Sequence, residues 1–454
     1  MKIICTLLLL FFSLVGFGQN PVRFSGELLS DHRLFTQNNQ NWAWNENRLD
    51  LNLEHRGDRL RFRGNVWLRH LGPPEVMDLQ GLYSRDKINP WNLNIREAFF
   101  EVRGFLSDNV DLKLGRQLIS WGTADYFNPT SMLNPFDLED ALDFGRRNGS
   151  FALNLTWFLN SDWSLQGVYI PFFSPGNLPL GAFAGVFDAR FELPEGLQLG
   201  RFETSVELPA HNLTEGATLG FRLKGLVGQT DISLSYIYGR EFLPFAHRAI
   251  IRPAGEVTIP GLVDLETNLF FPRFHMAGID MAGTIGNVGV WAEAGLFFPE
   301  REIKLTNDFS ALQGLPLGTL TADSLLMEKK PYPRFVVGAD YTFGNGTYMN
   351  IQYLHGFMHE RGQGNQNDYL IVAIERNLWG DQVLLRPVAG GFVIEAWQNI
   401  NENFAFFYTP SISFRGIDNL EINLGAFIFA GRGQSIFAGF KEMDMITASA
   451  RVSF

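Results

Sequence analysis

The chain ends in the stretch DMITASARVSF (Asp444–Phe454), in which two kinds of side chain alternate strictly. Apolar residues occupy every second position: Ile446, Ala448, Ala450, Val452 and Phe454. The positions between them are polar or charged: Thr447, Ser449, Arg451 and Ser453. Because successive side chains of a strand point to opposite faces, this period of two indicates a β-strand with one apolar and one polar face.

The same alternation is clearest near the N-terminus, in RLDLNLEHRGDRLRFRGNVWLR (Arg48–Arg69). Gly57-Asp58 interrupts the pattern, which then resumes, as expected of a β-hairpin. A two-residue turn at this point would pair Arg56 with Arg59 and Glu54 with Arg61. The hairpin is therefore predicted to carry a polar face next to an apolar one.

Short and long interruptions of the strand pattern alternate along the whole chain. The short ones fall at residues 57–58, 106–109, 160–162, 227–229, 286–287, 344–346, 379–381 and 416–419. The longer ones cover residues 30–47, 71–91, 122–148, 174–212, 242–272, 299–331, 359–367, 399–403 and 431–443. Barrels of outer membranes combine short periplasmic turns with long outer loops in this way.

We therefore predict an all-β fold, a transmembrane antiparallel up-and-down β-barrel with short periplasmic turns and long outer loops. Nine long and eight short connections imply 18 strands. The pattern is weakest at residues 174–212, which could hide a strand pair, and around Gly390-Gly391. An alternative count is about 16 strands.

The first residues differ from the rest of the chain. Lys2 precedes the apolar stretch 3–17, and small residues follow it. This order predicts a secretory signal peptide over residues 1–19, cleaved near Gly18 or Gln19, followed by a barrel over residues 20–454. The alternative, an uncleaved anchor helix, would be short for a membrane span of roughly 20 residues. The single cysteine, Cys5, lies in this segment, so no disulfide is expected.

The C-terminal stretch resembles the strand by which bacterial outer-membrane barrels are recognised for insertion, with Phe454 as its last residue. Aromatic residues near strand ends suit interfacial girdles, for example Trp67, Trp91, Trp121 and Tyr408. We predict export through the inner membrane to the outer membrane of a Gram-negative bacterium. The expected partners are outer-membrane lipid, lipopolysaccharide and the barrel assembly machinery, with a homo-oligomer as an option. The formal net charge of -11 argues against nucleic acid. A secreted all-β protein is the alternative class.

A predicted pore wall carries many charges. Arg59, Arg61 and Arg63 share one face of a strand, and an arginine facing lipid at the bilayer midplane costs about 2–4 kcal/mol. That face should therefore point into the lumen, as should the other wall residues, Glu54, Glu97, Arg96 and Arg116. Strict alternation turns the last two arginines outward. Arg96 points inward only if regular pairing begins after it, and Arg116 only if Gly115 forms a β-bulge. The charges could pair across strands, or they could set a field that selects solutes.

The predicted loop over residues 122–148 contains two Asn-Pro pairs, Asn128-Pro129 and Asn134-Pro135. A residue before proline is held extended, so the loop should be stiff enough to enter the lumen. Its acidic residues are Asp125, Asp137, Glu139, Asp140 and Asp143. We predict that they form the pore constriction opposite Arg61, Arg63, Arg96 and Arg116. The alternative is an outer cap that lies over the mouth.

Residues 94–143 carry a recognisable series of motifs: Arg96-Glu97, Gly115-Arg116-Gln117, Trp121-Gly122, Asp125 and an Asn-Pro pair. This series resembles a family of porin-like outer-membrane barrels of unknown function. It is also distantly similar to the polysaccharide-export porins. The resemblance implies a passive pore or transporter and names no substrate.

We predict a porin-like channel for the passive transport of hydrophilic solutes. The alternatives are a specific exporter or importer of an acidic polymer or hydrophobic compound, and a surface structural barrel. An enzyme ranks last, and no catalytic residue, metal site or cofactor is expected. His355 and His359 lie at a strand end, where the extended rise of about 3.3 Å per residue places them too far apart for one ion. The acids around Asp137 lack the glycine and ligand spacing of a calcium loop.

Overall fold

The computed structural model describes residues 22–37, 41–74, 76, 79–125, 127–184, 197–210, 212–254, 262–312 and 321–454. The predicted signal peptide, its cleavage site and Cys5 lie outside the described residues.

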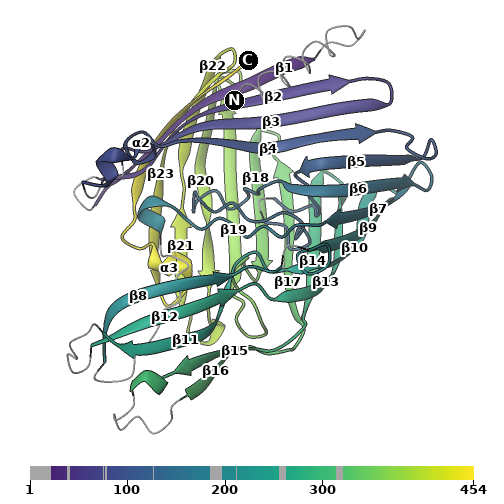
Figure 1. Cartoon of the computed structure of the whole chain (residues 1–454). Coiled ribbons are helices and arrows are strands. Elements are labelled where there is room, and N and C mark those ends of the chain that lie inside the picture. The colour runs from purple at the N-terminus through teal and green to yellow at the C-terminus, as the bar shows by residue number, and fades with distance from the viewer. Residues whose placement is uncertain are drawn as a thin grey trace.

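Antiparallel strands form one barrel (Figure 1). They are β1 (Arg23–Phe35), β2 (Trp42–Arg56), β3 (Leu60–Leu71), β4 (Trp91–Val102), β5 (Val110–Gln117), β6 (Ser150–Phe158), β7 (Trp163–Ile170), β9 (Thr218–Val227), β10 (Thr230–Arg240), β13 (Arg273–Ile285), β14 (Val288–Pro299), β17 (Tyr332–Thr342), β18 (Thr347–His355), β19 (Asp368–Leu378), β20 (Val383–Ile394), β21 (Phe404–Tyr408), β22 (Ser411–Ile417), β23 (Leu420–Arg432) and β24 (Met445–Ser453). The last strand, β24, pairs with the first, β1, so the sheet is closed.

The number of strand positions is eighteen, as predicted. The barrel sheet contains nineteen strands, but β21 and β22 occupy one position, since both pair with β20 on one side and with β23 on the other. This broken strand explains the irregular pattern near Gly390-Gly391. Gly390 lies so close to the broken strand that a β-carbon at this position would be 2.1 Å from the Phe407 carbonyl oxygen.

Short turns gather at one end of the barrel, here the short-turn end, and long connections at the other, the long-loop end. The loop expected over residues 30–47 is mostly strand, because β1 runs to Phe35 and β2 begins at Trp42. Its polar side chains bond across the two strands. The Ser30 hydroxyl donates to Asn47 at 2.8 Å, and His32 contacts Asn45 at 2.8 Å. These polar residues of the lumen face were therefore assigned to a loop in the sequence pattern, although they lie in strands.

The connections at the long-loop end are numbered by their order along the chain. The third to the seventh are loop 3 (residues 118–149), loop 4 (171–217), loop 5 (241–272), loop 6 (300–331) and loop 7 (356–367). Loops 4 to 6 contribute a second, five-stranded sheet: β8 (Gln198–Glu207), β11 (Phe245–Pro253), β12 (Leu262–Phe270), β15 (Ile303–Asp308) and β16 (Thr321–Met327). Figure 1 shows it beyond the barrel, at the lower left. The described part of residues 174–212 thus holds one strand, β8, which pairs with β12 outside the barrel.

The helices of the described residues are short and lie in the loops. They are η2 (Gly81–Tyr83), α2 (Arg85–Ile88), η3 (Gly181–Phe183), η4 (Ser310–Leu312), η5 (Trp397–Asn399) and α3 (Ile436–Gly439). None of the helices in this part of the chain has the length and apolar character needed to cross a membrane.

The two faces of the wall follow the sequence pattern. In β24, Ile446 is exposed on the outer face while Thr447 is buried on the inner face. The register of the β2–β3 hairpin differs from the prediction by two residues. Arg56 pairs with Arg61 and Glu54 with Arg63, because the Gly57 amide donates to the Leu60 carbonyl at 2.8 Å and widens the turn. A shift of two leaves every side chain on its predicted face.

Candidate functional site

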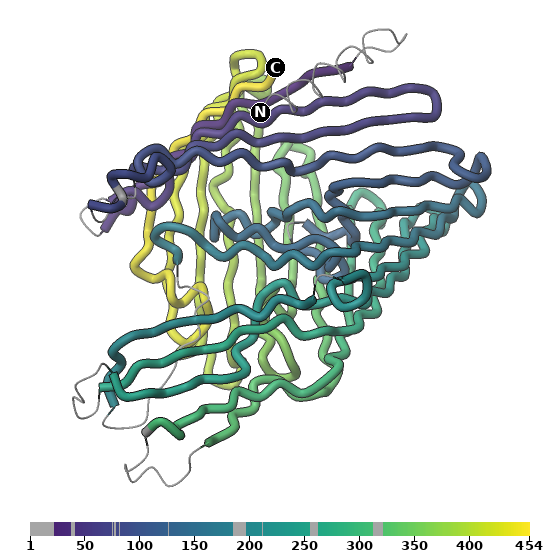
Figure 2. The backbone as a smooth tube through the Cα atoms, viewed as in Figure 1, coloured from purple at the N-terminus to yellow at the C-terminus, as the bar shows by residue number. Residues whose placement is uncertain are grey.

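Loop 3 lies inside the barrel. It leaves the wall at Gln117 and returns at Ser150, and Figures 1 and 2 show this dark-blue segment within the ring of strands. Most of its apolar residues are buried, with Trp121, Leu133 and Phe136 each 1% exposed. Loop 3 extends towards the short-turn end at Asp125, which accepts a hydrogen bond from Asn350 at 3.0 Å. Asn350 is close to the short-turn end of β18, so loop 3 spans much of the lumen's depth.

A buried carboxylate on the wall holds the first part of loop 3. Glu293 of β14 accepts hydrogen bonds from the Thr123 amide at 2.9 Å and the Thr130 amide at 2.7 Å. The Ala124 amide, the Thr130 hydroxyl and the Asn128 side chain donate to it as well. Glu293 is 2% exposed. Five donors on one carboxylate hold Thr123, Ala124, Asn128 and Thr130 against the wall at β14.

The asparagines of the two Asn-Pro pairs shape the loop through their side chains. Asn134 accepts from the Ile119 amide at 2.6 Å and donates to the carbonyls of Gln117 and Asn148. It thereby joins the two ends of loop 3 where they leave the wall. Asn128 donates to the Ala124 carbonyl at 2.8 Å. The stiffness predicted from the prolines therefore also depends on the asparagine amides.

Ion pairs tie the second part of loop 3 to the wall of β1 to β4. Arg33 contacts Asp140 at 2.6 Å, and Arg96 contacts Asp137 at 2.8 Å. Arg69 bridges Glu139 of the loop and Glu46 of β2. Burial raises the pKa of the Asp140 carboxyl, but Arg33, together with Arg146 and the Leu142 amide, holds that pKa below its usual range. Three of the five predicted loop acids are thus bound by wall arginines.

Trp67 lies at the centre of this network and not in an interfacial girdle. The guanidinium carbons of Arg48 and Arg96 lie 4.2 Å from its ring centroid, which is the geometry of a cation–π contact. Trp121 is also buried, in loop 3. The girdle assignment was wrong for both residues, because alternation and loop entry place them inside the barrel.

The predicted wall charges Glu54, Arg59, Arg61, Arg63 and Glu97 form ion pairs with nearby residues of the wall and its turns and not with loop 3. Arg61 contacts Glu101 at 3.4 Å, Arg63 contacts Glu97 at 3.0 Å, and Glu54 contacts Arg56 at 2.6 Å. Arg59 lies in the turn before β3 and points to Asp108 at the short-turn end. Arg61 and Arg63 therefore do not bind the loop acids that were predicted to oppose them. Pairing across strands, the first of the two interpretations, describes this part of the wall.

Arg96 and Arg116 have different outcomes. Arg96 points inward as predicted, but not for the predicted reason: strand pairing begins before it, at Trp91, and the β3–β4 register shifts between Asn65 and Val66, so that Arg96 is the extra residue of a bulge. The register shows no shift at Gly115, and Arg116 pairs with Ala98 and Phe151 on the outer face. The predicted inward position of Arg116 is wrong. Gly115 adopts a φ of 128° within regular pairing, and a β-carbon there would lie 2.4 Å from the Ala98 carbonyl oxygen.

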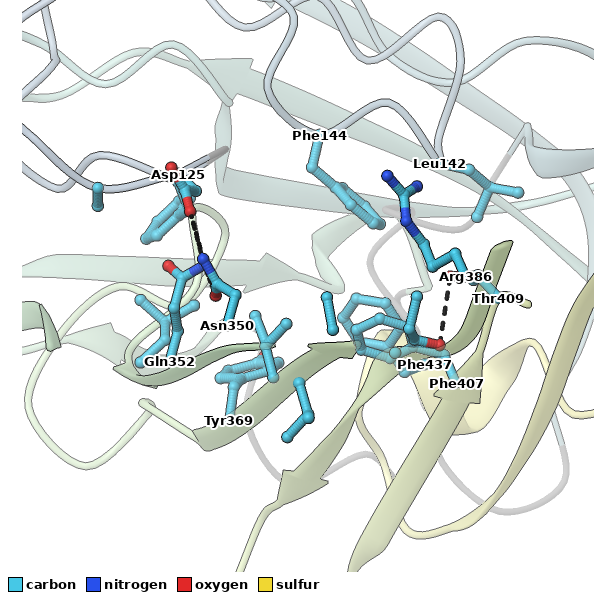
Figure 3. Close-up of a pocket in the computed structure, with 18 of the residues that line it drawn as sticks. Asp125, Leu142, Phe144, Asn350, Gln352, Tyr369, Arg386, Phe407, Thr409 and Phe437 are labelled. Carbon is cyan, nitrogen blue, oxygen red and sulfur yellow. Dashed lines mark hydrogen bonds between the residues drawn. The ribbon is translucent and has the colours of Figure 1, made fainter. Parts of the chain in front are cut away.

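A cavity of about 760 Å³ lies between loop 3 and the wall of β17 to β23. Figure 3 shows Asp125, Asn350 and Gln352 at one end of it and Arg386 with Thr409 at the other. Between them lie Phe144 and Tyr369, with Phe437 and Phe407 below. Asp143 lines the same cavity. Burial and the charge of Asp140 raise the pKa of the Asp143 carboxyl, and it accepts no hydrogen bond from a described residue.

Glu293, Arg33 and Arg146 also belong to the site, although the sequence pattern did not predict them. Arg146 belongs to loop 3 itself and contacts Asp137 at 2.9 Å. The strand pattern could have identified Glu293, because this glutamate lies directly opposite another acid, Asp280, on the neighbouring strand. Asp280 is neutralised by Arg222 at 3.3 Å. An inward acid opposite another acid needs a partner elsewhere, which here is loop 3.

Residues 22–380 match the protein family described as "Protein of unknown function (DUF1302)". The chain belongs to this family. The match confirms the family resemblance seen in residues 94–143. The closed barrel has the porin-like fold found in the Gram-negative outer membrane. A comparison with curated proteins gave no match.

Solved structures with a similar fold include OccK9 (OpdG) of Pseudomonas aeruginosa, at 9% identity and a TM-score of 0.49, covering 96% of this chain and 98% of that one. OmpF of Salmonella typhi, in complex with daunomycin, shows 11% identity and a TM-score of 0.41, with 96% and 98% covered. OmpT of Vibrio cholerae, in its trimer form, shows 8% identity and a TM-score of 0.40, with 96% and 100% covered. At these identities the likeness concerns the fold alone.

Proposed function

We propose that this DUF1302 protein is a channel for the passive transport of small and medium water-soluble solutes, with loop 3 as its constriction. The observation that carries the proposal is the attachment of loop 3 on both sides of the lumen. Glu293 holds residues 123–130 on one side, and Arg33 and Arg96 hold Asp140 and Asp137 on the other. A loop bound at both sides narrows the pore without closing it by collapse.

The charges of the constriction are largely paired, so selection by a single free ring of charge is not the mechanism we favour. Asp125 and Asp143 are the predicted loop acids that line the cavity. The cavity is therefore the part of the path in which a solute would meet loop 3. A specific transporter for a partly apolar compound is the second candidate, because the cavity lining is rich in phenylalanine.

The proposal includes the route to the membrane. Residues 1–19 would direct export through the inner membrane, and the barrel assembly machinery would act on β24 and Phe454, which is 63% exposed. Lipopolysaccharide would contact the outer surface at the long-loop end. A homo-oligomer stays a prediction.

Conductance in planar bilayers tests the channel, and absence of any current would overturn it. Cysteine labelling tests the position of loop 3. The single cysteine of the sequence, Cys5, lies in the predicted signal peptide, so an introduced cysteine would be the one thiol of the barrel. A charged methanethiosulfonate reagent should reduce the current through Asp143→Cys. It should not affect Asp108→Cys, whose side chain is 95% exposed at a turn of the short-turn end. Equal effects on both variants would contradict a constriction at loop 3.

A further inference from the structure

The cavity beside loop 3 is lined by many aromatic side chains. Seven phenylalanines line it: Phe127, Phe144, Phe357, Phe407, Phe427, Phe429 and Phe437. Several are in mutual contact, with ring centroids of Phe407 and Phe437 4.8 Å apart and those of Phe127 and Phe357 5.0 Å apart. The wall rings and the loop rings therefore form one continuous apolar surface, on which the flat or extended body of a solute could lie.

The charged residues around this surface are mostly acidic. The cavity is lined by three carboxylates, Asp125, Asp143 and Glu375, and by one cation, Arg386. The Arg386 guanidinium is 2.6 Å from Glu375, so these two charges neutralise each other. The carboxylates of Asp125 and Asp143 then give the lining its net charge.

Asp125 is held in place without being neutralised. Its Oδ2 accepts hydrogen bonds from the Asn350 amide at 3.0 Å and the Gln352 amide at 3.3 Å. In the described part of the chain, no lysine or arginine forms an ion pair with Asp125, and its Oδ1 accepts no hydrogen bond. The two neutral amides orient the carboxylate and leave its charge and one oxygen available to a ligand.

We propose that the cavity binds small amphipathic cations, such as an organic amine or quaternary ammonium with an aromatic or short alkyl body. The ammonium group lies at Asp125, and the apolar body packs on Phe144, Tyr369 and Phe437. A volume of about 760 Å³ is within the usual range of small-molecule sites. Aromatic faces attract a desolvated cation further, whereas an amphipathic anion would be repelled by the Asp125 carboxylate, which has no ion-pair partner among the described residues. This inference rests on the proposed channel function and names its solute class.

Block of the ionic current measures the binding. Benzyltrimethylammonium is the probe, tetramethylammonium matches its charge without the ring, and benzenesulfonate matches the ring with the opposite charge. For the full chain in planar bilayers we expect reversible block by benzyltrimethylammonium at concentrations about tenfold lower than for either control. Asp125→Asn should weaken that block about tenfold, and Asp125→Glu should restore it.

Two further variants separate binding from folding. Phe437→Leu should weaken the block by the aromatic cation more than Phe414→Leu, because Phe414 lies on the outer face of β22. Heat-modifiable mobility on gels checks that each variant forms a barrel. Normal conductance with equal block by all three probes, or no change in Asp125→Asn, would overturn the inference while leaving the channel intact. Absence of conductance in the unmodified protein would instead overturn the proposed function.

Discussion

Gly122 and Glu293 are in such close contact that a β-carbon at position 122 would lie 2.3 Å from the Glu293 carboxylate. Gly122 also adopts a φ of 88°, which side chains other than glycine rarely tolerate. The glycine of the Trp121-Gly122 motif thus permits loop 3 to turn onto the one wall residue that binds five of its donors.

Gly122→Ala should therefore detach the start of loop 3 from Glu293. We expect a free-energy cost of about 2 kcal/mol or more, from the positive φ and the displaced carboxylate together, and a larger single-channel conductance. Urea unfolding in detergent and planar-bilayer recordings measure the two effects. Gly286→Ala is the matched control, since Gly286 has a φ of 64° with no atom within 4 Å of an added β-carbon. An equal loss in both variants would show that only backbone strain is involved.

Glu293→Gln should have a similar effect on the current for a different reason. The amide nitrogen of glutamine cannot accept from the Thr123 and Ala124 amides, and each buried donor left unpaired costs about 1–3 kcal/mol. We expect loop 3 to become accessible to proteases between residues 122 and 130. Glu203→Gln, on exposed strand β8, serves as the control. Unchanged proteolysis and conductance in Glu293→Gln would refute the role of this carboxylate as the anchor.

Removal of one partner of the Arg33–Asp140 pair should lower the free energy of unfolding, whereas replacement of both partners should change it little. Arg33→Ala leaves a buried carboxylate unpaired and should cost about 3–5 kcal/mol, whereas exchanging both residues for apolar ones of similar size should be close to neutral. The double variant Arg33→Met with Asp140→Leu is therefore expected to be more stable than Arg33→Ala alone. Unfolding in urea compares them. A double variant less stable than the single one would contradict this account of the pair.

The pKa values of the Asp140 and Asp143 carboxyls are shifted in opposite directions from the ordinary value of 3.8. The pKa of Asp140 is lowered in the folded protein. Its contribution to the free energy of unfolding is therefore complete above a pH of about 3.8 and is lost only as the pH falls through the lower folded pKa. The pKa of Asp143 is raised in the folded protein, so as the pH is lowered this carboxyl takes up a proton at a higher pH than Asp140 does. As the pH falls towards about 4, cation preference should decline while loop 3 stays attached. Reversal potentials in a salt gradient follow this decline, and Asp143→Asn should flatten it.

The sequence predicted which side chains face the lumen much better than how deep each one lies. Alternation assigned Arg61, Arg63 and Glu97 to the inner face, and an error of two residues in the hairpin register did not change this. Partners depend on depth and on the path of loop 3, which alternation does not contain. Arg33 meets Asp140 across 107 positions, and no local pattern joins them. The sequence therefore predicted that Asp137 and Asp140 lie in the lumen, but it did not identify all of the arginines that bind them.

The contrast between Arg96 and Arg116 is the sharpest test of the observed registers. Arg96 binds buried Asp137, so Arg96→Leu should cost about 3 kcal/mol or more and change the conductance. Arg116 lies on the outer face near the long-loop end of β5, where an arginine close to the interface costs only about 0–1 kcal/mol. Arg116→Leu should therefore leave both the unfolding free energy and the current nearly unchanged. A large loss of stability or an altered current in Arg116→Leu would mean that this residue faces the lumen after all, with a bulge at Gly115.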